Sequence, residues 1–96
     1  MIETTLNIPL DMQDHQWEIL SDVYKELDGW SGYSEDGLPV WYSDPDCGGE
    51  GVTASAEPSG LLLISNLPSE LWESWLNTFI EKASEKLQFI VKDAED

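Results

Sequence analysis

Two side chains in this sequence could act as a nucleophile or a base, and neither has the neighbours that such chemistry needs. His15, the only histidine, precedes a run with helical spacing and is expected on its solvent side, where nothing orients it as a general base. Cys47, the only cysteine, lies among Asp44, Asp46 and Glu50, and neighbouring carboxylates disfavour the thiolate. The sequence therefore predicts no catalytic residues and a protein that is not an enzyme.

The segment around the cysteine, residues 44–51, has the closely spaced carboxylates with which a calcium loop begins. Counted from Asp44, the sixth position holds Gly49, as in an EF-hand, but the twelfth holds Ser55 in place of the bidentate glutamate. A single cysteine also excludes an intramolecular disulfide and a cysteine-based zinc site. We predict a turn here, with no metal or cofactor, and weak binding of a divalent cation stays open.

The strongest signal in the sequence is its charge. The 96 residues carry 20 acidic side chains against four lysines and no arginine, which gives a formal net charge of −16. Self-repulsion of this size destabilises a compact fold, so we expect the charge to serve a partner. Nucleic-acid backbones are bound by lysine and arginine, and anionic membranes repel an acidic surface. The predicted partner is therefore a basic protein, with no direct binding to nucleic acid or membrane.

The acidic residues are concentrated in the first half of the chain. Residues 11–50 have a net charge of −10 and residues 51–96 a net charge of −5, and Glu3 completes the total. Tryptophan and tyrosine, which dominate the energy of many interfaces, lie among the first group, where acids would steer a basic partner. Some of these aromatic side chains must belong to the core, since Trp41 and Tyr42 fall on opposite faces of one short strand. The predicted partner-binding residues are Asp22, Glu26, Asp28, Trp30, Tyr33, Glu35, Asp36, Trp41, Asp44 and Asp46.

Apolar spacing divides the chain into seven elements. Strands are predicted over 3–8, 38–43, 52–57, 61–64 and 88–92, and helices from an N-cap at Asp11 to a stop at Gly29 and from Pro68 to Leu87. Segment 30–37 is predicted as a loop, and the chain is expected to end in an acidic tail from about residue 93. Each helix has one apolar face. The predicted fold is a single α+β domain over residues 1–96, a two-layer sandwich in the order β-α-β-β-β-α-β with both helices on one face of a largely antiparallel sheet. The order of the strands within the sheet and the oligomeric state stay open.

Composition and apolar runs indicate the class of protein. Hydrophobic residues make up 41% of the chain, with five tryptophans, which argues against disorder despite the charge. The longest apolar run, Leu61 to Ile64, is far shorter than the roughly 20 residues that cross a bilayer. The first residues lack the basic and apolar regions of a signal peptide. We therefore expect a soluble, cytoplasmic protein.

This profile of small size, high acidity and aromatic content resembles that of bacterial immunity proteins that neutralise nuclease toxins. It also resembles that of phage-encoded inhibitors that mimic nucleic acid. The resemblance lies in composition, and it favours the immunity protein, because a mimic more often spreads its acids along an elongated surface. The expected function is inhibitory binding to a basic toxin or nuclease, as in a toxin–antitoxin pair. A non-inhibitory adaptor or assembly domain is the alternative from another class.

Overall fold

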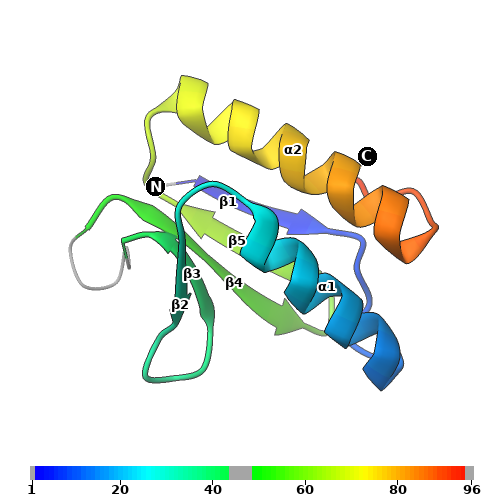
Figure 1. Ribbon diagram of the computed structural model, residues 1–96. Coiled ribbons are helices and arrows are strands. Elements are labelled where there is room, and N and C mark those ends of the chain that lie inside the picture. Colours follow the sequence, from blue (N-terminus) through cyan, green and yellow to red (C-terminus); the bar gives the residue numbers. More distant parts are fainter. Residues whose placement is uncertain (1, 44–48, 95–96) are drawn as a thin grey trace.

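Both helices of this protein lie on one face of a single antiparallel sheet (Figure 1). The computed structural model describes residues 2–43 and 49–94. Its elements are β1 (Ile2–Leu6), α1 (Asp14–Glu26), β2 (Trp30–Tyr33), β3 (Pro39–Tyr42), β4 (Gly51–Glu57), β5 (Gly60–Ser65) and α2 (Ser69–Leu87). The strands are ordered β1-β5-β4-β3-β2, each antiparallel to its neighbours. The predicted α+β class and two-layer arrangement are confirmed.

The core forms between the helices and the inner face of the sheet. Alternation along β4 and β5 sends Val52, Ala54, Leu61 and Leu63 to this face, and Ala54 lies opposite Leu63 in the register. The apolar stripes of both helices cover these side chains, with Leu20, Val23, Phe79 and Ala83 fully buried. No helix in the described part of the chain is long and apolar enough to cross a membrane.

The prediction of a loop over 30–37 was wrong for its first half, because Trp30–Tyr33 forms the edge strand β2. Trp30 pairs with Trp41 of β3, and a register shift between Trp30 and Gly32 accommodates a bulge. Gly32 has a φ of 92°, which an L side chain rarely adopts. Glycine and serine in this segment are typical of a loop, but cross-strand aromatic packing makes it a strand.

The predicted final strand over 88–92 is also wrong, and this segment is bonded to Asn7, just after β1. α2 ends where Gln88 adopts a left-handed φ of 64°. The side chain of Asn7 then donates to the Ile90 carbonyl at 2.9 Å and accepts from the Lys92 amide at 2.8 Å. The Asn7 backbone amide also donates to the Lys92 carbonyl at 2.9 Å and the Ala94 amide to the Thr5 carbonyl at 2.8 Å, but these bonds make only an isolated bridge between Leu6 and Asp93. The C-terminal end of β1, at one edge of the sheet, thus pairs with the segment after α2, and β2 forms the other edge.

The first helix begins later than predicted, at Asp14 instead of after an Asp11 cap. The backbone amide of Gln13 donates to the Gln16 side chain at 3.1 Å. Gln13 and Gln16 thus form a capping box, which fixes the start of α1. Asp11 lies in the preceding turn and is exposed. The first five residues of the predicted turn at 44–51 and the last two residues of the acidic tail lie outside the described residues.

Candidate partner-binding surface

Trp41, one of the predicted partner-binding residues, belongs to the core. Its side chain is 0% exposed, and its Nε1 donates to the Tyr24 carbonyl at 2.9 Å. The indole packs against Tyr24, Trp75 and Phe79, with ring centroids 5.2, 4.9 and 6.4 Å away. It therefore cannot contact a partner directly, but it fixes the strand that carries the exposed aromatic residues.

The exposed part of the predicted surface lies on the β2–β3 hairpin and the turn before it. We call Asp28, Trp30, Tyr33, Glu35 and Asp36 the hairpin patch. Its three carboxylates are exposed, Tyr33 is 53% exposed, and Trp30 is half-buried. Tyr33 packs edge-on against Trp30 at 5.3 Å, and Trp30 stacks on Tyr24 at 6.4 Å. A continuous aromatic stack thus connects the exposed tyrosine to the core.

The turn of the hairpin holds Glu35 and Asp36 outward. The Gly37 amide donates to the Ser34 carbonyl at 2.9 Å, which closes a turn whose two central residues are these acids. The Ser34 amide donates to the Leu38 carbonyl at 2.8 Å, and the Ser34 hydroxyl accepts from the Leu38 amide at 3.2 Å. The two carboxylates are therefore held at a defined position beside Tyr33.

Tyr42, an aromatic residue that was not among the predicted site residues, lies near the Asp28 carboxylate. Its backbone has a φ of 66°, and its amide donates to the Gly29 carbonyl at 2.6 Å. The ring packs so closely on Gly29 that a Cβ there would lie 2.8 Å from three ring atoms. Burial, and then the nearby Asp28 carboxylate, raise the pKa of the Tyr42 phenol above its ordinary value of 10.0. The left-handed residue at 42, which creates this junction, has no signal in the sequence.

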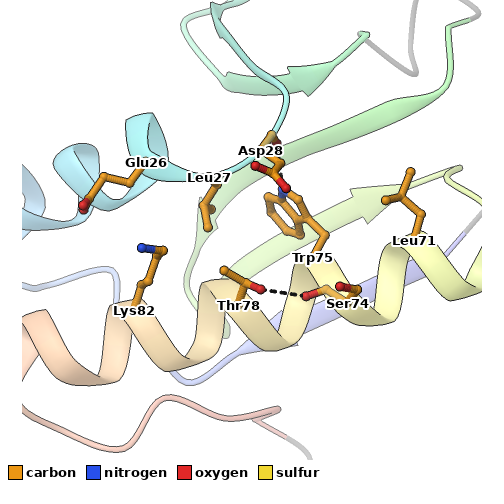
Figure 2. A pocket seen from close by; sticks show the side chains of 8 residues that line it. All are labelled: Glu26, Leu27, Asp28, Leu71, Ser74, Trp75, Thr78 and Lys82. Carbon is orange, nitrogen blue, oxygen red and sulfur yellow. Dashed lines mark hydrogen bonds between the residues drawn. The ribbon is translucent and has the colours of Figure 1, made fainter.

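Asp22 and Glu26 do not belong to the hairpin patch, because α1 directs them toward α2. With Ile19, Val23 and Lys86 they line a hollow of about 440 Å³ between the helices. A second hollow of about 300 Å³ continues from Glu26 to Asp28, and Figure 2 shows its residues. Lys82 and Lys86, one turn apart on α2, thus line the same hollows as acids of α1.

The remaining predicted residues carry no structural assignment. Asp44 and Asp46, like Cys47, lie outside the described residues, and His15 is exposed near the start of α1. Within the described ranges, no group of three or more histidine, cysteine or acidic side chains is arranged to hold a metal ion. Comparison with protein-family models, with curated proteins and with solved structures found no match.

Proposed function

We propose that this protein is a small inhibitory binding protein that neutralises a basic protein partner through the hairpin patch. The observation that carries the proposal is Tyr33, an exposed aromatic side chain that is stacked on the core through Trp30 and flanked by exposed carboxylates. In this proposal the protein acts in the cytoplasm, by binding and without catalysis. Its partner is a toxin, most simply a nuclease, and the protein is its immunity protein.

The aromatic stack supports this proposal because it lowers the cost of binding. Ordering a mobile side chain at an interface costs about 0.5–1.5 kcal/mol, and a side chain that is already held avoids much of that cost. Tyr33 is held by Trp30, which contacts both Tyr24 and Trp41. Tyrosine and tryptophan anchors of this kind are enriched among residues that dominate binding energy.

The negative charge of the hairpin patch supports a basic, nucleic-acid-binding protein as the partner. A protein that binds nucleic acid needs a basic surface for the phosphates, and that surface is complementary to Asp28, Glu35 and Asp36. The described molecule measures 33 × 28 × 24 Å, so it lacks the elongated form along which a nucleic-acid mimic would spread its acids. These dimensions favour the immunity protein over the mimic.

The experiment compares two triple charge reversals in a capture assay. Asp28→Lys/Glu35→Lys/Asp36→Lys changes the hairpin patch, and Glu70→Lys/Glu73→Lys/Glu81→Lys makes the same change in net charge at exposed acids of α2. Tagged wild-type and variant proteins are used to capture basic proteins from the source cell. The affinity of the purified complex is then measured at about 0.05 and 0.5 M salt, where the screening length falls from above 10 Å to below 8 Å.

We expect the patch variant to weaken binding at least tenfold more than the α2 variant, and high salt to weaken wild-type binding. Equal losses in both variants would show that bulk charge acts without the patch. Recovery of neutral partners alone, with binding insensitive to salt, would overturn the proposal in favour of an adaptor domain.

A further inference from the structure

The hollow between the end of α1 and the first half of α2 combines an apolar floor with an acidic wall (Figure 2). Leu27 and Trp75 are buried beneath it, whereas Leu71 is 40% exposed at its rim. The volume of about 300 Å³ is at the lower limit for small-molecule sites, which span about 300–1,000 Å³. A space of this size fits one long side chain better than a separate ligand.

The charges of the hollow are unevenly placed along its length. Lys82 lies at the end where Glu26 is found, and the Asp28 carboxylate lies at the other end beside the Trp75 indole (Figure 2). Thr78, between them, uses its hydroxyl to donate to the Ser74 carbonyl at 3.0 Å. The lysine among the lining residues thus lies at the Glu26 end, and the Asp28 end combines a carboxylate with the apolar surface of Trp75.

We propose that this end of the hollow receives an arginine side chain of the basic partner. The methylene groups would lie on Leu71, and the guanidinium would pair with the carboxylate of Asp28. Arginine fits better than lysine because its planar group donates two parallel hydrogen bonds to a carboxylate and is less strongly hydrated. The inference deepens the proposed function and rests on it, since the arginine belongs to the same partner.

Asp28 lines this hollow and also belongs to the hairpin patch, at the opposite end of β2 from Glu35 and Asp36. Asp28 precedes Gly29 and Trp30, and its carboxylate lies near the Tyr42 phenol, whose pKa it raises. A partner seated on Tyr33 and the hairpin acids would thus have the hollow at the margin of its contact. Arginine is also among the residues that most often dominate interface energy when they fill such a hollow.

The test is an NMR titration of the whole protein with N-acetyl-L-arginine amide, and with the citrulline and lysine counterparts as probes. The Trp75 indole proton reports on the hollow, because Nε1 donates to the Asp28 carbonyl at 3.3 Å. We expect saturable chemical-shift changes at Trp75 and Asp28 with the arginine probe. The lysine probe should bind at least threefold more weakly, and the neutral citrulline probe should not bind. Asp28→Asn should abolish the shifts, and Glu73→Gln, which removes an exposed acid outside the hollow, should preserve them.

Shifts that are equal for citrulline, or that persist in Asp28→Asn, would overturn the inference, as would shifts confined to residues outside the hollow. The titration needs no partner protein, so its failure leaves the salt-sensitive capture test of the hairpin patch unaffected. Conversely, arginine binding in the hollow with no basic partner captured would reject the proposed function alone. In the captured complex, Asp28→Asn should lower affinity about tenfold more than Glu73→Gln.

Discussion

Replacing Trp41 with phenylalanine tests whether this residue acts through the core. The substitution removes two carbon atoms from a fully buried ring, worth about 0.8 kcal/mol each before any cavity term. It also removes the hydrogen bond from Nε1 to the Tyr24 carbonyl, worth about 0.5–1.5 kcal/mol net. That carbonyl keeps a second donor, the Leu27 amide at 3.3 Å, which limits the penalty. We expect a loss of about 2–4 kcal/mol in the free energy of unfolding once the cavity term is included.

A loss of this size is large for this chain. At about 0.05–0.15 kcal/mol per residue, 96 residues correspond to a total of about 5–14 kcal/mol. The melting temperature should fall by about 4–8 °C for each kcal/mol, so by roughly 8–30 °C. Urea unfolding followed by far-UV circular dichroism measures the change, and Trp17→Phe, the same substitution at a half-buried position on α1, is the control. The reasoning is refuted if Trp41→Phe costs less than about 0.5 kcal/mol, or no more than Trp17→Phe.

Two further substitutions test particular contacts. Gly29→Ala should destabilise the protein by at least about 1 kcal/mol more than Gly37→Ala. Both glycines have a φ of 83°, but only a Cβ at Gly29 would meet the Tyr42 ring. Equal losses of stability in thermal unfolding would contradict this packing. Burial, and then the charge of Tyr33, raise the pKa of the Tyr24 phenol above its ordinary value of 10.0. The unfolded chain therefore releases this proton first, so its contribution to stability is complete below pH 10 and declines as the pH rises further, by about 1 kcal/mol between pH 10 and 11. Between pH 10 and 11 the free energy of unfolding of Tyr24→Phe should therefore fall by about 1 kcal/mol less than that of the wild type, as measured by urea unfolding. The same fall with pH in both proteins would show that Tyr24 is not buried as described.

Much of the fold could be predicted from local patterns. The alternation of Val52, Ala54 and Ala56 identified β4, and helical spacing identified the buried faces of α1 and α2. The errors fell where local pattern and tertiary contact disagree. Trp30–Tyr33 has the composition of a loop, and its pairing depends on Trp41, eleven residues later. Residues 88–92 have the composition of a strand, and they are bonded to one distant residue, Asn7, through its side chain and its backbone amide.

The candidate surface divides in the same way. The grouping of Asp28, Tyr33, Glu35 and Asp36 as partner-binding residues stays a prediction, and the structure places Asp28 before β2 and the other two acids in the turn after it. Sequence reasoning could not assign Trp41 to the core, since alternation in a four-residue strand does not say which face the helices cover. Nor could it place Asp22 and Glu26 in one hollow with Lys86, because that hollow depends on how the two helices pack on the sheet.

The sequence by itself determined the excess of negative charge, its concentration before residue 51, and the α+β class, because composition and periodicity are properties of the chain. Tertiary structure alone decided which aromatic side chain is exposed and which acids face lysines. It also decided that Asp28 joins the hairpin patch to the hollow between the helices. Those properties depend on contacts between α1, α2 and the hairpin, and no local spacing specifies the packing of elements that are distant in the chain.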